Sequence, residues 1–233
     1  MDGDSVILID TGSEEKPALL SMLEEHHLTP KAIINTHLHI DHIGCNKLLQ
    51  EAFGCPAFCP LEEIEDAIYD AGIVSPEDPI GPCTTIPLPG HSIAHQAVVT
   101  PDGVCFLGDA IMSTYSKMPY YQNVGKSIES MKKILDLSYP DFVLSHAGVH
   151  ERDETHQIVM DNIKKECDRL DQILALCHRK IKTEKLAALF MDSIHISRET
   201  QDIFWVTDTA KARIQELARQ GKIEIKNGYA HSV

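Results

Sequence analysis

The sequence lacks several features that would point to whole classes of protein. No apolar run approaches the roughly 20 residues that a membrane-spanning helix needs, so we expect no membrane segment. The N-terminus shows no basic region followed by an apolar stretch, which is the pattern of a secretory signal. The sequence also contains no internal repeat and no low-complexity segment. These absences favour a globular protein of the cytoplasm.

Basic residues are scarce relative to acidic ones. The chain of 233 residues has 21 Lys and Arg against 35 Asp and Glu, a formal net charge of −14. Because this charge repels a nucleic-acid backbone, we expect a small-molecule substrate and no nucleic-acid partner. The seven cysteines include no C-x-x-C pair, which argues against a zinc ribbon or a thioredoxin-like site. Their scatter favours reduced, mostly buried thiols.

Residues 1–150 alternate short apolar runs with helical patterns. We predict strands at 5–10, 32–34, 57–58, 84–88, 96–100, 104–107 and 142–144, and helices at 15–27, 43–53, 61–71 and 125–137. Residues 72–82 are rich in proline and glycine and predict a loop. Strands mixed with covering helices indicate a layered domain of the α/β or α+β class.

Residues 151–233 differ in character and predict a second domain. Helical patterns cover 153–178, 182–192 and 206–220, and a hairpin of 222–226 with 229–232 follows on an Asn-Gly turn. Three helices and a hairpin are typical of a winged-helix-like domain. Helix 206–220 mixes basic and acidic residues and makes no continuous basic stripe. We therefore expect this domain to cap the active site or to form a dimer surface.

Four candidate metal ligands crowd into six positions after the strand at 32–34. They are His37, His39, Asp41 and His42. Two imidazoles two residues apart on an extended backbone point to the same side and can share an ion. Asp41 and His42 turn the other way and can serve a second ion. Neutral imidazole and ionised carboxylate, which metals require, are both available near neutral pH.

Three further candidate ligands each follow an apolar strand. They are His91, Asp109 and His146, each with a glycine nearby that lets the backbone turn sharply and approach an ion. Each is a weak signal alone: His91 also suits a turn and His146 a helix end. Together with the first four they make seven ligands, enough for two ions.

Five short motifs in this order resemble the metallo-β-lactamase superfamily. They are Asp10-Thr11-Gly12, Thr36–Gly44, Pro89-Gly90-His91-Ser92, Gly108-Asp109-Ala110 and Ser145-His146-Ala147-Gly148. The resemblance covers about residues 5–150 and is greater to glyoxalase II-like and lactonase-like hydrolases than to true β-lactamases. It implies an α+β fold, an αββα sandwich, which the winged-helix-like domain predicted from residues 151–233 would follow.

The resemblance also implies a role for each residue. His37, His39 and His91 would bind one ion, Asp41, His42 and His146 the other, and Asp109 would bridge the two. Asp41 would in addition hold or accept a proton of the attacking water. Zinc is the expected metal, with two ions per chain, although iron and manganese suit the same ligands.

Three residues are predicted to support the ligands or the reaction. Asp10 would orient a ligand loop, although a plain turn residue explains it equally well. His95 would support the ligands, with a structural histidine as the alternative. The resemblance places the loop at 111–124 beside the metals, so Tyr115 would donate to a developing oxyanion; a tyrosine packed under that loop is the alternative.

The chain departs from the family pattern at its N-terminus. Family members carry one or two strands ahead of the Asp-Thr-Gly motif, whereas about five residues precede the Val6–Ile9 strand here. We therefore expect an exposed sheet edge, left by truncation or covered by a partner, and we regard a homodimer as a plausible assembly.

The function that these patterns favour is two-metal hydrolysis. A metal-bridging hydroxide would attack a small ester, thioester or lactone. The first alternative is a mononuclear iron persulfide dioxygenase, which would use His37, His39 or their neighbours with Asp109. The second is a non-enzymatic metal sensor whose tail binds DNA or a protein. Nuclease activity, found within the superfamily, is disfavoured by the acidic charge.

Overall fold

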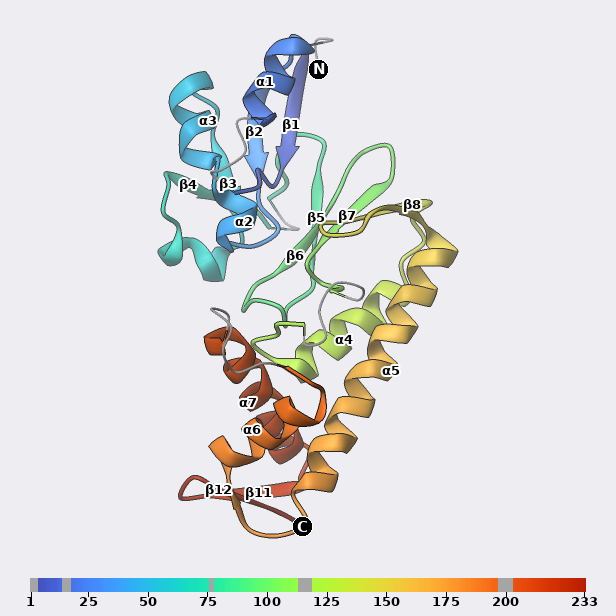
Figure 1. The fold of residues 1–233 in the computed structure, drawn as a ribbon. Coiled ribbons are helices and arrows are strands. Elements are labelled where there is room, and N and C mark those ends of the chain that lie inside the picture. The colour runs from blue at the N-terminus through green and yellow to red at the C-terminus, as the bar shows by residue number, and fades with distance from the viewer. Residues whose placement is uncertain (1–3, 14–17, 76–77, 113–118, 197–202) are drawn as a thin grey trace. The chain divides into compact units, whose positions relative to one another are not determined.

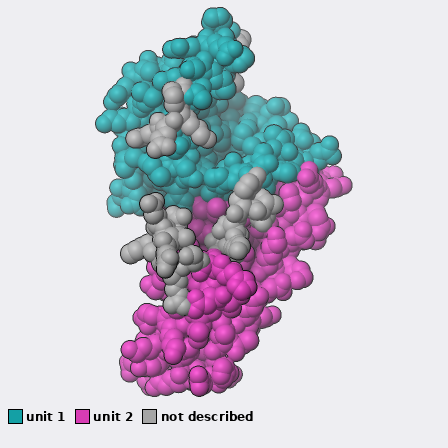
Figure 2. All heavy atoms as spheres, viewed as in Figure 1, with its two compact units in different colours: residues 1–88, 93–109, 139–151 teal, residues 89–92, 110–138, 152–233 magenta. Residues whose placement is uncertain are grey.

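The structure of the chain is a computed structural model that describes residues 4–13, 18–75, 78–112, 119–196 and 203–233. These residues form two compact units (Figure 2). The first unit comprises residues 1–88, 93–109 and 139–151, and the second comprises 89–92, 110–138 and 152–233. Residues 110–138 thus group with the C-terminal helices, a division that differs from a single cut after residue 150.

A parallel sheet of four strands forms one layer of the first unit (Figure 1). Its strands lie in the order β1 (Ser5–Ile9), β2 (Thr29–Ile34), β3 (Ala57–Cys59) and β4 (Ala71–Ile73). The connections carry α1 (Ala18–Glu25), α2 (Ile40–Ile43), α3 (Asn46–Phe53) and the 3-10 helix η1 (Leu61–Asp66). Parallel strands need such crossovers because each must return to the same end of the sheet.

The two faces of β2 pack against different parts of the first unit. Ile33 packs in one buried cluster with Leu23 of α1 and Leu49 of α3. Ile34, the next residue, packs in another cluster with Val98. Successive side chains of a strand point to opposite faces, so helices cover one face of the sheet and a second sheet covers the other.

The second sheet has five strands in sequence order. They are β5 (Thr84–Pro87), β6 (Gln96–Val99), β7 (Val104–Gly108), β8 (Asp141–Leu144) and β9 (Gly148–Glu151). Only β7 and β8 pair in parallel, and the other neighbours pair antiparallel. Val98 and Phe106 of this sheet meet Ile34 and Phe58 of the first. The two sheets therefore pack face to face around a shared apolar layer.

The second unit is mainly helical. It contains α4 (Val124–Leu135), α5 (Arg152–Leu176), α6 (Thr183–Ser193) and α7 (Ile203–Arg219), with a sheet of β10 (Ile181–Lys182), β12 (Tyr229–Ser232) and β11 (Ile223–Lys226). Phe190 of α6, Ile173 of α5 and Leu217 of α7 belong to its buried core. The fully buried Arg213 lies 2.7 Å from Glu166, an ion pair within this unit.

The structure corrects several predicted elements. The predicted helix at 61–71 is wrong: η1 ends at Asp66, and Ala71–Ile73 pair with β3 as β4. Like charges three and four residues apart, such as Glu62 with Glu65 and Asp66, disfavour a longer helix. The pairing of β4 with β3 also places a strand inside the predicted loop at 72–82. Strands β9 and β10 were not predicted, and β10 turns the C-terminal hairpin into a three-stranded sheet.

Over the ranges that the structure describes, no helix has both the length and the apolarity needed to cross a membrane.

Two adjacent leucines of α3 test how the helix layer contributes to stability. Leu49 is fully buried and Leu48 is 44% exposed. We expect Leu49→Ala to lower the free energy of unfolding by about 2–5 kcal/mol, because it removes apolar contacts and leaves a cavity. Leu48→Ala, with the same change in helix propensity, should cost less than about 1 kcal/mol. Urea unfolding followed by circular dichroism measures both, and equal losses would contradict the assigned faces.

Candidate metal centre

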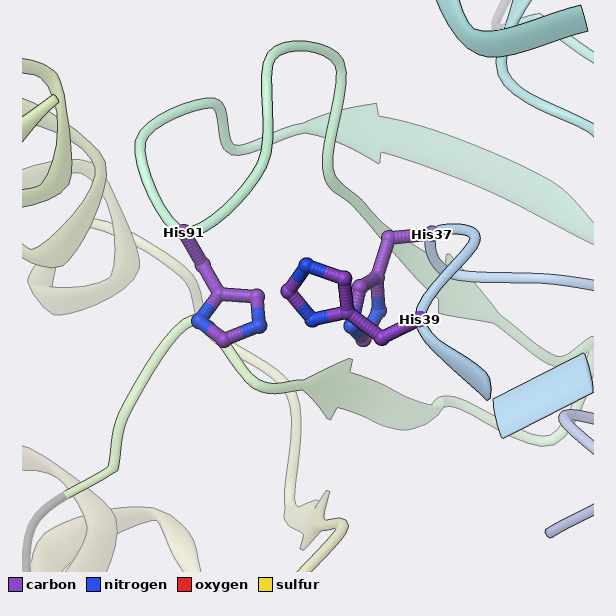
Figure 3. A group of neighbouring side chains, drawn as sticks. All are labelled: His37, His39 and His91. Carbon is purple, nitrogen blue, oxygen red and sulfur yellow. The ribbon is translucent and has the colours of Figure 1, made fainter. Parts of the chain in front are cut away.

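The loop after β2 presents two histidines. Strand β2 ends at Ile34, and the chain stays outside the helix until α2 begins at Ile40, with His39 extended at φ −70° and ψ 146°. The rings of His37 and His39 lie edge to face with centroids 4.5 Å apart. Figure 3 shows both side chains projecting from this loop, and draws His91 from the turn between β5 and β6.

Asp10 fixes this loop from the end of the neighbouring strand. It follows β1 with a positive φ of 56°, a conformation that aspartate tolerates better than most residues. Its Oδ1 accepts the backbone N–H of Thr36 at 2.8 Å, and its Oδ2 accepts the Thr36 hydroxyl at 2.8 Å. Oδ2 also lies 2.8 Å from Nδ1 of His42. With Nδ1–H donating to this carboxylate, Nε2 of His42 is the atom left to bind an ion.

Four of the predicted ligands gather around one point. Nε2 of His42 lies 3.4 Å and Nε2 of His146 lies 3.3 Å from Oδ1 of Asp109. The same two nitrogens lie 3.8 Å and 3.7 Å from Oδ2 of Asp41. Two ligands bound tetrahedrally at 2.0–2.2 Å from one ion stand about 3.4 Å apart. The spacing and the donor types therefore fit a divalent cation.

The carboxylates of this group change the basicity of its histidines. Burial lowers the pKa of His42, but hydrogen bonds to Asp10 and Asp109 outweigh burial and raise that pKa to about 10. The hydrogen bond to Asp109 likewise raises the pKa of His146. For His39, burial prevails and lowers the pKa. The field around Asp109 thus favours positive charge, whether a proton or a metal ion supplies it.

Asp109 also belongs to a second group of candidate ligands. Ligand atoms of His37, His42 and Asp109, all buried, lie within 4.8 Å of one another. Nδ1 of His37 lies 3.0 Å from the hydroxyl oxygen of Thr36, which itself donates to Asp10. That oxygen can accept Nδ1–H, which again assigns the metal-binding role to Nε2. A buried carboxylate common to both groups is the arrangement that a bridging ligand needs.

His95 supports Asp109 through the backbone. Its Nε2 accepts the N–H of Asp109 at 3.0 Å. Burial lowers the pKa of His95 to about 3, so the ring is neutral and able to accept. Gly108 has φ 53°, and a Cβ there would lie 2.6 Å from the Thr36 hydroxyl and 2.7 Å from Nε2 of His95. A glycine is therefore required immediately before Asp109.

His91 and Tyr115 are the two remaining predicted residues. His91 belongs to the short segment 89–92 of the second unit, where its Nδ1 lies 3.0 Å from the carbonyl oxygen of Tyr120. That contact leaves Nε2 as its ligand atom, and its binding alongside His37 and His39 stays a prediction. Tyr115 lies outside the described residues.

Sequence reasoning missed Glu63, a buried residue of η1. Its Oε2 accepts the N–H of Leu38 at 2.9 Å, and its Oε1 accepts the N–H of Ala94 at 3.1 Å. In the sequence Glu63 stands among three other acidic residues of the same short helix. No local pattern distinguishes the one that turns inward.

A pocket of about 330 Å³ lies within the first unit beside Asp41, His42 and His146. Asp41 and His146, 48% and 43% exposed, line it together with His42. Ile9, Phe106 and Val143 add apolar surface. A pocket of this size and mixed lining accommodates a small molecule.

Comparison with known proteins identifies similar sequences and a similar fold. Residues 2–102 match the family model of the metallo-beta-lactamase superfamily. Over these residues the chain resembles that superfamily. A metallo-beta-lactamase family protein from Thermus thermophilus has the same fold, with a TM-score of 0.80 at 18% identity over 99% of this chain and 91% of that one. The predicted α+β metallo-β-lactamase fold is thereby confirmed.

Curated relatives match this chain over different shares of its length. A hydroxyacylglutathione hydrolase from Hyphomonas neptunium is 31% identical over 56% of this chain and 52% of its own length. The beta-lactamase-like protein 2 homolog of Drosophila melanogaster is 24% identical over 96% of this chain and 82% of its own. An uncharacterized protein of Mycobacterium tuberculosis is 34% identical, and the chain spans 33% of it. The chain thus spans a third to a half of several relatives that it matches.

Replacing Asp10 tests whether its hydrogen bonds prepare the site. We expect Asp10→Asn to weaken zinc binding by about 10–100-fold, because His42 loses the acceptor that orients its ring. Asp4→Asn, an exposed change of the same charge near the start of β1, is the matched control. Isothermal calorimetry on metal-free protein gives both affinities. Equal binding by the two variants would show that Asp10 is only a turn residue.

Proposed function

We propose that this chain is a binuclear metal-dependent hydrolase of a small ester, thioester or lactone. The observation that carries the proposal is the place of Asp109, whose carboxylate lies within reach of both His37 and the pair His42 and His146. A carboxylate shared in this way suits two ions a few ångströms apart. Relatives named as hydroxyacylglutathione hydrolases, and the match of residues 2–102 to the metallo-beta-lactamase superfamily model, support hydrolysis over other chemistry.

The residues of the chain would divide the work of binding and catalysis. His37, His39 and His91 would hold one divalent ion, Asp41, His42 and His146 the other, with Asp109 between them. Two such ions, when bound, supply a hydroxide near neutral pH and polarise a carbonyl oxygen. Asp41 is half exposed at the pocket. It can therefore hold a proton of the attacking water while Asp10 and His95 keep the buried ligands in place.

The size of the pocket and the charge of the chain favour a small substrate. About 330 Å³ is near the lower end of the range for ligand sites. Ile9, Phe106 and Val143 can contact an apolar acyl group, and Ser145 can donate to a polar one. A net charge of −14 opposes a nucleic-acid substrate. Zinc is the metal that His and Asp ligands suit best, with iron and manganese as alternatives.

Metal content and turnover of matched variants test the proposal. We expect about two zinc ions per wild-type chain by elemental mass spectrometry, and hydrolysis of at least one ester, thioester or lactone in a panel. Asp109→Ala should lose most of the metal and all measurable turnover, because it removes the shared ligand. His39→Ala should abolish turnover as well. His178→Ala, an exposed histidine outside the predicted ligands, should leave metal and turnover unchanged.

Three results would overturn the proposal. Turnover retained in Asp109→Ala would exclude the two-metal mechanism. A chain that binds two ions yet cleaves no member of any substrate class would exclude the hydrolase. A single iron per chain, with oxygen consumption on a persulfide, would replace it with the dioxygenase.

A further inference from the structure

One buried carboxylate connects two backbone segments that carry the candidate metal centre. Glu63 of η1 is 3% exposed, and each of its oxygens accepts one backbone N–H, from Leu38 at 2.9 Å and from Ala94 at 3.1 Å. Carboxylates are rarely buried, because losing water costs them several kcal/mol unless hydrogen bonds or a cation compensate. The two hydrogen bonds therefore help to offset the cost of burying the Glu63 carboxylate.

The two N–H groups belong to segments that matter for the ligands. Leu38 stands between His37 and His39. Ala94 immediately precedes His95, whose Nε2 accepts the N–H of Asp109. The five residues that these contacts connect all lie within the first unit: Leu38, Glu63, Ala94, His95 and Asp109.

We propose that Glu63 is a positioning residue of the metal centre. Its carboxylate accepts the backbone N–H groups of both Leu38 and Ala94. It thereby sets the spacing between His37 and His39, in the loop after β2, and the bridging carboxylate of Asp109. The inference rests on the metal set of the proposed function, but not on any substrate.

Glutamate suits this positioning role better than glutamine. Two N–H donors need two acceptor atoms, and a carboxylate presents both at the end of one side chain. A glutamine has a single acceptor oxygen, so it would leave one buried N–H facing its NH₂ group. The negative charge has a further effect: a cation bound by His37 and His39 is attracted to it in a partly desolvated setting. Glu63 and the ion therefore stabilise each other.

Zinc affinity of two neighbouring variants tests the inference. Glu63→Gln should weaken zinc binding about 10–100-fold, the effect usual for residues that orient metal ligands. Glu62→Gln makes the same change on an exposed residue of the same helix and should stay within about twofold of wild type. Competition with a chromogenic chelator measures both. Glu63→Asp, which keeps the charge but shortens the reach, should recover part of the lost affinity.

A merely structural role predicts a different result. Glu63→Gln would then lower the melting temperature of the metal-free chain while leaving zinc affinity within about twofold of wild type, and this would overturn the proposal. If the variant does not fold, hydrogen exchange on the wild-type chain decides. The amides of Leu38 and Ala94 should both exchange slowly, and more slowly still with zinc bound. Fast exchange of either, or no response to zinc, contradicts the proposal.

These readouts need no substrate, so the two proposals fail separately. Weak zinc binding by Glu63→Gln together with a wild-type chain that hydrolyses nothing would keep the positioning role and remove the hydrolase. Normal zinc binding by Glu63→Gln together with hydrolysis by the wild-type chain would keep the hydrolase and remove the positioning role.

Discussion

The candidate metal centre depends on one constraint: carboxylate and imidazole ligands must be held close together inside the protein before an ion binds. Asp10 meets that constraint by attaching the end of β1 to the loop after β2, with three hydrogen bonds to two residues of that loop and its helix. Because β1 and β2 are parallel neighbours, their carboxyl ends meet at one edge of the sheet. The ligand loop is thereby held by the same pairing that builds the sheet, and Asp109 approaches it from the second sheet.

The sequence predicted the class of fold, and it pointed to one candidate ligand loop, because both are local patterns. Short continuous apolar runs marked most strands, and four ligand-type side chains in six positions marked the loop after β2. The sequence also indicated that Asp109 and His146 lie beside that loop, since each follows an apolar strand. The family resemblance then supplied the order of the motifs, which spacing alone does not give.

What the sequence did not predict are the features that only tertiary contacts decide. Whether Asp10 is a turn residue or a hydrogen-bonding centre depends on residues 26 and 32 positions away. Glu63 has the same sequence surroundings as its exposed neighbours, and only the contacts to Leu38 and Ala94 distinguish it. Short strands such as β4 and β10 carry too few residues to show a period, so pairing with a neighbour defines them.

The four candidate ligands Asp41, His42, Asp109 and His146 come from both sheets, and this affects how long the folded protein would persist. Asp41 and His42 come from the first sheet's connections, whereas Asp109 and His146 follow strands of the second. An ion held by all four would act as a reversible cross-link between the sheets, in the way that a disulfide joins two segments. Its contribution to stability grows with the logarithm of free metal concentration. Metal scarcity would therefore loosen the sandwich itself, and the half-life of the chain would follow the supply of metal.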